Sequence, residues 1–423
     1  MKVHRAEGEP AAVEEPADGL WALALAAATA GFASLSLEVA WFRVLGLVLG
    51  ASAYAFSLML LAFLVGIAVG GEAGGWLADR LGRRARAGAG LLQVGVATLA
   101  WGAMWLYGWL PLVFVWLFFQ IKPFPELIWP AKCIVAMLVM TPPALLMGAT
   151  FPVLIRAASP SARAEDVGVI YGANTAGGVL GAFLAGFVLL PRIEVVGTVQ
   201  VAVAVNLLGA VVLWARRSQL WALPLPILLA LLYIFQPPPW DPMLMTAGVY
   251  KYVDNLDEPT WKEMKKEMLD RYHLLHYKEG LSTVVTVGKN RVTGNIWLAN
   301  NGKIDASTTA DMPTQVLVAH LPFLFLGDQT RKTMLIGLAS GITLGAMNLH
   351  PELEEIQVVE IEPSMPMATN FFRTWNHDAL SDPRIHLYGN DGRNQVLLTP
   401  PGSMDLIVSE PSNPWLTGVS NLF

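Results

Sequence analysis

The stretch Thr333–Ser364, TMLIGLASGITLGAMNLHPELEEIQVVEIEPS, decides the fold of the second half of this chain. Its pattern is strand, glycine turn, helix and strand, which is the opening of a Rossmann-like βαβ unit. Gly337 and Gly341 bracket the turn after the first strand, where the absence of side chains lets a ligand approach the backbone. Glu362 is predicted to end the second strand, where an acid can accept the hydroxyls of a ribose. The stretch therefore predicts a nucleoside site.

Two further strands carry polar residues at their predicted ends. RIHLYGNDGR (384–393) predicts a strand that ends at Asn390 and Asp391, and DLIVSE (405–410) predicts one that ends at Glu410. The carboxyl ends of parallel strands meet at one edge of a sheet, where open α/β sheets hold ligands. A single carboxylate at a strand end is a solvated turn residue about as often as it is a functional residue. Four successive strand ends with polar residues, however, indicate a site.

The residues before this sheet predict a smaller β-structure. STVVTVGKNRVTGNIWLANNGKIDAS (282–307) alternates around turn residues, as hairpins do, and QVLVAHLPFLFL (315–326) is typical of a buried helix. We predict a small β-subdomain over 275–310 and a Rossmann-like, methyltransferase-type α/β domain over 311–423. A sheet of that type has about seven strands, and this chain stops after its fourth, so we expect a C-terminally incomplete gene product.

The first half has the composition of a membrane domain. The chain is 54% hydrophobic and 14% charged, against about 25% charged residues in an ordinary soluble domain. Nearly all long apolar stretches precede residue 236, and a helix needs about 20 residues to cross a hydrocarbon core. About seven stretches are long enough: 20–42, 51–74, 87–110, 131–155, 167–190, 197–215 and 219–236. 

We therefore predict a polytopic α-helical membrane domain over 20–236, between a disordered tail over 1–19 and a linker over 237–274. The expected location is the cell (inner) membrane, as a multi-pass protein. Glycine and alanine recur at helical spacing in this domain, which favours close helix packing over a transport path. Glu38 and Arg43 lie near one helix end, where snorkelling and mutual pairing would satisfy both.

Arginines predict the orientation of this domain. They mark the loops after the second, fourth and sixth spans, which should be cytoplasmic: Arg80, Arg83, Arg84, Arg86, Arg156, Arg163, Arg216 and Arg217. If 219–236 crosses fully, the second half lies outside, whereas a re-entrant segment leaves it in the cytoplasm. A further half-span at 110–121 would also change whether the number of crossings is odd or even. The side of the membrane on which the second half lies therefore stays open.

Other composition features exclude some classes of function. The net charge of −5 leaves no basic footprint, so we expect no nucleic-acid partner. The single cysteine, Cys133, excludes an intrachain disulfide and a cysteine-cluster metal site. We predict no metal ion and no prosthetic group.

Two resemblances to known families follow from these motifs. GGWLADRLGRR (74–84), with Asp79 and Arg80, resembles the loop motif of major facilitator transporters, although about seven spans fall short of the twelve usual there. From about residue 275 to the end, the chain resembles the spermidine synthase family, the polyamine aminopropyltransferases. The motifs that carry this are NGKIDAS, AHLPFLFL, MLIGLASGITLGA, VVEIEP, DPRIHLYGNDGR and DLIVSEPSNPWLTGVSNLF. With its membrane half, the chain is similar to bacterial membrane-fused spermidine synthase-like proteins.

The resemblance implies roles on the donor side, with decarboxylated S-adenosylmethionine as the co-substrate. It implies that Glu362 binds the ribose and that Asp391 with Gly392 contacts the adenine. Ser340 stands where the family has an Asp facing the amino end of the donor. Glu410 takes the position of the catalytic Asp that deprotonates the attacking amine.

The acceptor side departs from the family. Asn413 replaces a second acid, and Asp305, Thr314, Gln315 and Val316 stand where the family has Gln after its strand turn and Tyr-His-Glu on the helix. The loss of that aromatic and acid removes much of what holds a diamine cation. We still predict Asp305, Gln315 and Asn413 on the substrate side.

Three functions follow as alternatives. The first is a membrane-tethered aminopropyltransferase of polyamine biosynthesis, and the second is a methyltransferase that uses S-adenosylmethionine in the same pocket. The third is a transporter or sensor whose Rossmann-like domain only binds its ligand. The expected partners are the lipid bilayer and a small amine substrate, with a homo-oligomer left open.

Overall fold

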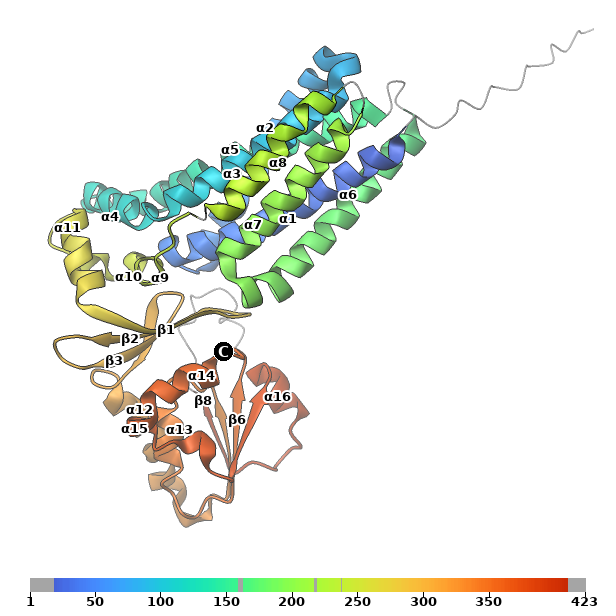
Figure 1. Cartoon of the computed structure of the whole chain (residues 1–423). Coiled ribbons are helices and arrows are strands. Elements are labelled where there is room, and N and C mark those ends of the chain that lie inside the picture. Colours follow the sequence, from blue (N-terminus) through green and yellow to red (C-terminus); the bar gives the residue numbers. More distant parts are fainter. Residues whose placement is uncertain (1–18, 159–162, 217–218, 237, 410–423) are drawn as a thin grey trace, which may run out of the picture.

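The computed structural model describes residues 19–158, 163–216, 219–236 and 238–409 (Figure 1). An elongated bundle of helices makes up the first half, and two β-sheets follow at one end of it. Nearly all of the predicted N-terminal tail and the last fourteen residues, 410–423, lie outside the described ranges. The expectation of an incomplete C-terminal domain therefore stays a prediction.

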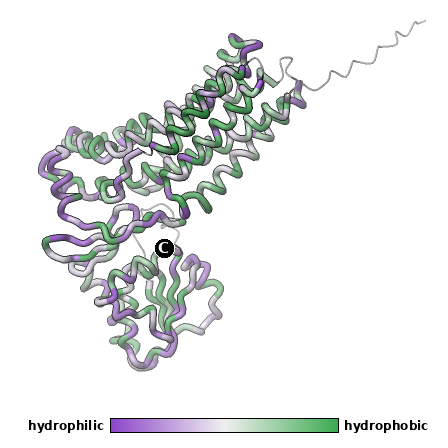
Figure 2. The backbone as a smooth tube through the Cα atoms, viewed as in Figure 1, coloured by the Kyte–Doolittle hydropathy of each residue, from purple (hydrophilic) through white to green (hydrophobic). Residues whose placement is uncertain are grey.

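The bundle consists of apolar helices of unequal length. They are α1 (Leu20–Leu49), α2 (Ala53–Leu81), α3 (Ala85–Tyr107), α4 (Leu110–Ile121), α5 (Ile128–Ala158), α6 (Ala164–Leu184), α7 (Leu190–Trp214) and α8 (Pro224–Phe235). Figure 2 shows hydrophobic residues along these helices and hydrophilic residues gathered toward the ends of the bundle. This distribution is typical of helices whose sides face an apolar medium.

The number of membrane spans differs from the prediction of about seven. Four continuous helical stretches in the described residues are long and apolar enough to cross a membrane: Leu20–Leu49, Ala53–Tyr107, Pro125–Ala158 and Ala164–Trp214. The predicted span at 219–236 contains a 3-10 turn over Leu220–Ala222 and the 12-residue α8, and the apolar helix that they form, Leu220–Phe235, is too short to be one of these four.

The two longest stretches each contain a break. Gly82, with φ of +49°, follows α2, and the helices on either side of it, α2 and α3, both pack along α5. Glu194, with φ of +60°, interrupts the start of α7, and α6 and α7 both pack along α1. Both breaks lie between spans that the sequence predicted as separate, 51–74 and 87–110 for the first, and 167–190 and 197–215 for the second.

Glycines set the closest helix contacts of the bundle, as the recurrence of small residues predicts. A Cβ atom on Gly177 of α6 would lie 2.0 Å from the carbonyl oxygen of Ala28 in α1. On α2, a Cβ atom on Gly70 would lie 2.1 Å from the carbonyl oxygen of Leu145 in α5. These distances leave no room for any side chain, so the backbones of both helix pairs touch directly.

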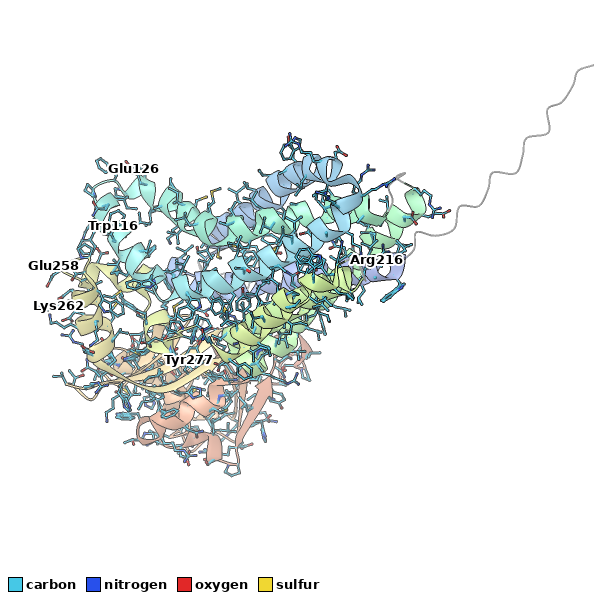
Figure 3. The ribbon with its side chains drawn as sticks, turned by 45° about the horizontal axis from the view of Figure 1, so that its top comes forward. Trp116, Glu126, Arg216, Glu258, Lys262 and Tyr277 are labelled. Atoms are coloured by element: carbon cyan, nitrogen blue, oxygen red, sulfur yellow. The ribbon has the colours of Figure 1, made fainter. Side chains whose placement is uncertain are left out.

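Arginine side chains gather at the end of the bundle where α1 begins. Arg86, in the first turn of α3, donates from Nε to the carbonyl oxygen of Leu213 at 2.8 Å in the last turn of α7. Gly19 lies against both Arg86 and Arg216. Figure 3 places Arg216 at the opposite end of the bundle from Tyr277, which belongs to the first β-strand.

Short helices lead from the bundle to an antiparallel sheet. They are α9 (Pro242–Met245), α10 (Val249–Tyr252), α11 (Trp261–Met264) and a π-helical turn over Lys265–Asp270. The sheet has the order β1 (Tyr272–Glu279), β2 (Val284–Asn290), β3 (Ile296–Asn300) and β4 (Lys303–Ser307). Hairpin turns therefore join each strand to its neighbour. We call this sheet the β-subdomain.

A parallel sheet follows, reached through α12 (Met312–Leu326). Its order is β7-β6-β5-β8, built from β5 (Lys332–Ile336), β6 (Glu355–Glu360), β7 (Ile385–Gly389) and β8 (Leu406–Ser409). The helices between the strands are α13 (Ile342–Met347), α14 (Met365–Thr369), α15 (Arg373–Asn376) and α16 (Gly392–Leu398). 

The pairing of these strands places their carboxyl ends at one edge. Ile336 pairs with Ser409, and Glu360 pairs with Gly389. The chain order reverses around β5, which has β6 on one side and β8 on the other. Such a switch point is where open α/β sheets bind ligands. Figure 1 shows this edge directed toward the β-subdomain and the bundle.

We predict that Gly177→Ala will destabilise the bundle, because the new methyl group meets the backbone of α1. Overpacking of this kind costs about 1–3 kcal/mol. The thermal unfolding midpoint of the full chain in detergent measures the effect. Gly172→Ala, on the same helix with open space around its Cβ position, is the matched control. Equal midpoints for the two variants would show that the α1–α6 contact does not need glycine.

Candidate functional site

The turn after β5 shapes one side of the candidate site. Gly337, at φ of +93°, follows the strand, and its N–H donates to the carbonyl oxygen of Val359 at 2.8 Å. Gly341 adopts φ of +74° directly before α13, and a Cβ atom there would lie 2.7 Å from Cγ2 of Thr369. Both positions require the conformations that glycine adopts without strain. The predicted glycine turn is therefore present between β5 and α13.

Glu360, which the sequence reasoning missed, lies beside this turn. It is the last residue of β6 and is 8% exposed. Its carboxylate accepts from the N–H of Leu338 at 2.9 Å and from the N–H of Glu362 at 2.8 Å. Burial raises the pKa of Glu360. The signal that could have found it is its place as the final residue of the apolar run IQVVE.

Glu362 does not end the strand, as the sequence predicted, but lies two residues beyond it. Its carboxylate is 2% exposed and accepts from the N–H and Oγ of Ser282, both at 2.9 Å, and from the N–H of Thr283 at 3.3 Å. It also accepts from the N–H and Oγ of Ser364 at 3.0 and 2.8 Å. Burial opposes ionisation, yet these hydrogen bonds hold the pKa of Glu362 below its usual range. Both oxygens are thus engaged by protein groups.

Ser340 and Gln315 are brought together by the fold. The Ser340 hydroxyl donates to Oε1 of Gln315 at 2.6 Å, and Nε2 of Gln315 donates to the carbonyl oxygen of Ser307 at 2.9 Å. Both side chains are at most 2% exposed. The pair braces the glycine turn against α12 and the end of β4. The predicted roles of Ser340 toward the donor and of Gln315 toward the substrate stay predictions.

Asp391 and Gly392 lie one strand farther along the same edge, after β7. The carboxylate of Asp391 accepts from the N–H of Asn394 at 2.9 Å and so caps α16. Gly392 packs on β5, where a Cβ atom would lie 2.5 Å from Cγ2 of Ile336. These two residues therefore shape the edge that Glu360 shares.

The remaining predicted residues lie elsewhere. The carboxylate of Asp305, on β4, pairs with Lys303 and accepts from Nδ2 of Asn300 at 3.0 Å, so it is engaged within the β-subdomain. Glu410 and Asn413 lie outside the described residues. Among the side chains of the described ranges, no group of three or more His, Cys, Asp or Glu residues is placed to hold a metal ion.

No family model matches this chain, so the likeness of its first half to major facilitators stays a prediction. Among curated proteins, it is similar to the polyamine aminopropyltransferase of Serratia proteamaculans, with 28% identity over 31% of this chain and 45% of that one. The spermidine synthase of Dictyostelium discoideum is 24% identical over 33% of this chain and 49% of that enzyme. The putrescine N-methyltransferase 3 of Nicotiana tabacum is 29% identical over 28% of this chain and 30% of that enzyme.

These matches establish a low-identity similarity to spermidine synthases and polyamine aminopropyltransferases over about a third of the chain. The chain spans half the length, or less, of the first curated relatives. Among solved structures, a spermidine synthase in complex with the transition state analogue AdoDATO covers 36% of this chain, at 19% identity and a TM-score of 0.33.

We predict that Ser340→Ala will destabilise the full chain, because Oε1 of Gln315 loses its buried donor. A buried acceptor left without a partner costs about 1–3 kcal/mol. Ser403→Ala is the control, since the Ser403 hydroxyl donates to Pro400 in an exposed turn, where substitutions change stability by about 0.5 kcal/mol or less. Thermal unfolding midpoints compare the two. An unchanged midpoint for Ser340→Ala would contradict the bracing role.

Proposed function

We propose that this chain is a membrane-anchored transferase that moves an aminopropyl group from decarboxylated S-adenosylmethionine to an amine. The observation that carries the proposal is the Glu360 carboxylate, which lies at the end of β6 against the glycine turn. The similarity to polyamine aminopropyltransferases supports it.

The hydrogen-bond acceptors at this edge of the sheet fit a hydroxyl group of a nucleoside. A carboxylate offers about four lone-pair sites, and two backbone N–H groups use the oxygens of Glu360. The N–H of Ile361 also acts on this carboxylate, so acceptor capacity remains for a ribose hydroxyl. Glu362, with five hydrogen bonds from Ser282, Thr283 and Ser364, has none to spare. We accordingly move the proposed ribose contact from Glu362 to Glu360.

The proposed reaction is a direct displacement. The amine nitrogen attacks the methylene carbon beside the sulfonium, a C–N bond forms, and the C–S bond breaks to leave a neutral thioether. The protein holds the two reactants in line and removes one proton from the attacking amine. Glu410 is the proposed base, on the strength of the family resemblance, because it directly follows β8 in the sequence.

The surface of the bundle supports the membrane anchor. Large apolar side chains are widely exposed on it, among them Leu138 of α5, Val179 of α6 and Leu228 of α8, each more than 60% exposed. A soluble monomer rarely exposes apolar surface on this scale, whereas a bilayer covers it.

A second candidate function is ligand binding without transfer, as in a sensor or transporter. The observation that favours it is the position of Arg86 and Arg216 at the end of the bundle far from the β-subdomain. Basic residues flank the cytoplasmic ends of membrane helices, so this distribution predicts that the sheets lie on the other side, away from the cytoplasmic donor nucleosides.

The identity of the donor can be tested by isothermal titration calorimetry on the full chain. We expect decarboxylated S-adenosylmethionine to bind more tightly than S-adenosylmethionine. Glu360→Gln should weaken that binding about 10- to 100-fold, because a charged acceptor is lost. Glu355→Gln, at the other end of β6, is the control.

We expect Glu410→Gln to abolish transfer but not binding.

Each other outcome of the titration has a meaning. Preference for S-adenosylmethionine, followed by methyl transfer, would replace the proposal with a methyltransferase, the activity named for the Nicotiana tabacum relative. Donor binding without any transfer would favour the second candidate. The absence of binding by either nucleoside would overturn the nucleoside site itself.

The side of the membrane can be tested with reporters fused at Phe423. The second candidate, with the arginine distribution, predicts alkaline phosphatase activity and no fluorescence from a cytoplasmic fluorescent protein, whereas the proposed transferase, whose donor is cytoplasmic, requires the fluorescence. Fusions that end at Arg216 are the control and should behave in the opposite way. Fluorescence at Phe423 would instead place the sheets with the soluble donors and remove the main support for the second candidate.

A further inference from the structure

The turn between β1 and β2, residues 280–283, is held from both halves of the molecule. On one side its Ser282 and Thr283 donate to Glu362 beside the parallel sheet. On the other side Arg43, in α1 of the bundle, donates from Nη2 to the carbonyl oxygens of Gly280 and Leu281, both at 3.1 Å. The sequence predicted that Arg43 would pair with Glu38; the structure places its guanidinium on this turn instead.

A second bundle helix holds the strand that leads into the turn. Glu279, the fully buried last residue of β1, accepts from the N–H of Val195 at 2.8 Å and from the hydroxyl of Tyr277 at 2.6 Å. Val195 directly follows Glu194, whose φ of +60° and ψ of −177° break the helix. A non-glycine residue in that conformation costs about 1–3 kcal/mol. The break releases the Val195 N–H from the helix and presents it to Glu279.

Charge reinforces this arrangement. The carboxylates of Glu279 and Glu362 are the acids whose charges act on the Arg43 guanidinium. Burial raises the pKa of Glu279 to about 7, while the positive charge of Arg43 acts in the opposite direction. A buried carboxylate is costly without such compensation. Removal of Arg43 would therefore leave two acids close to the turn without their cation.

The contact extends from the turn to the candidate site. Glu362, which the turn fixes through Ser282, donates its own N–H to Oε1 of Glu360 at 2.8 Å. The chain of contacts is thus Arg43, the turn, Glu362 and Glu360. A displaced turn would change the orientation of the carboxylate that we propose for the ribose.

We propose that Arg43 of the helical bundle is a positioning residue for the nucleoside site, acting through the turn 280–283 and Glu362 on Glu360. The inference rests on the proposed function for the identity of the ligand. It gives the bundle a part in the site in addition to anchoring the chain, because the site takes its final geometry from a contact 237 residues away in sequence.

The test compares Arg43→Gln, Arg43→Lys and the control Arg192→Gln, an exposed arginine of α7, in the full chain in detergent. Hydrogen exchange of the amides of 280–284 reports on the turn without any ligand. Calorimetry with decarboxylated S-adenosylmethionine, or with S-adenosylmethionine if the wild type prefers it, reports on the site. We expect faster exchange and about tenfold weaker binding for Arg43→Gln, partial recovery for Arg43→Lys, and wild-type values for the control.

Gly280→Ala tests the same path without touching the bundle. A Cβ atom there would lie 2.1 Å from Oε1 of Glu362, so the variant should also weaken nucleoside binding. If Arg43 acts through the turn, the double variant Arg43→Gln/Gly280→Ala should lose less binding than the sum of the single losses. A merely structural effect would lower the unfolding midpoint without this non-additivity in affinity.

The outcomes separate the two proposals. If the wild type binds a nucleoside and Arg43→Gln binds it equally well, the Arg43 inference is wrong and the proposed function stands. If the wild type binds neither nucleoside, the proposed function is wrong and the positioning role falls with it, whatever the exchange data show. Unchanged exchange in 280–284 for Arg43→Gln would also overturn the inference, because the turn would then not depend on Arg43.

Discussion

The hydrogen bonds that converge on the carboxylate of Glu362 hold the second half of the molecule together. Ser282 and Thr283 bring the β-subdomain to it, and Ser364 brings the segment after β6. Because charge-assisted hydrogen bonds are about twice as strong as neutral ones, this buried anion reinforces the shared hydrophobic core that joins the two sheets. The glycine at position 280 makes the approach possible, since any larger residue would strike the carboxylate.

The architecture of the parallel sheet could be predicted from the sequence, whereas the acid that ends β6 could not. Apolar runs bounded by glycine and polar residues indicate the strands of the second half and their order along the chain. The end of β6 at Glu360 rather than Glu362 depends on where the pairing with β7 stops, and only tertiary structure decides that. The two-residue error at this strand end matters, because Glu360 can still accept hydrogen bonds, whereas both oxygens of Glu362 are already occupied by protein donors.

The helical half of the chain was predicted in part. Glycine spacing indicates close helix packing, and the contacts of Gly177 and Gly70 agree with it. The sequence separated the predicted spans near Gly82 and near Glu194, but it did not show that the chain turns there through a positive φ inside a helical stretch. The partners of Arg43 could not be predicted either, because they are backbone carbonyl oxygens of a distant turn, and every residue type has such an oxygen.

The break at Glu194 has a consequence for how the two halves can be separated. An isolated C-terminal fragment would contain the carboxylate of Glu279 without the Val195 N–H, and the carbonyl oxygens of Gly280 and Leu281 without the Arg43 guanidinium. These three acceptors, which receive hydrogen bonds from the bundle in the full chain, would then depend on water for their hydrogen bonds. The two halves are therefore not interchangeable modules, because a graft of the sheets onto a different helical bundle would lose the hydrogen-bond donors that Arg43 and Val195 supply.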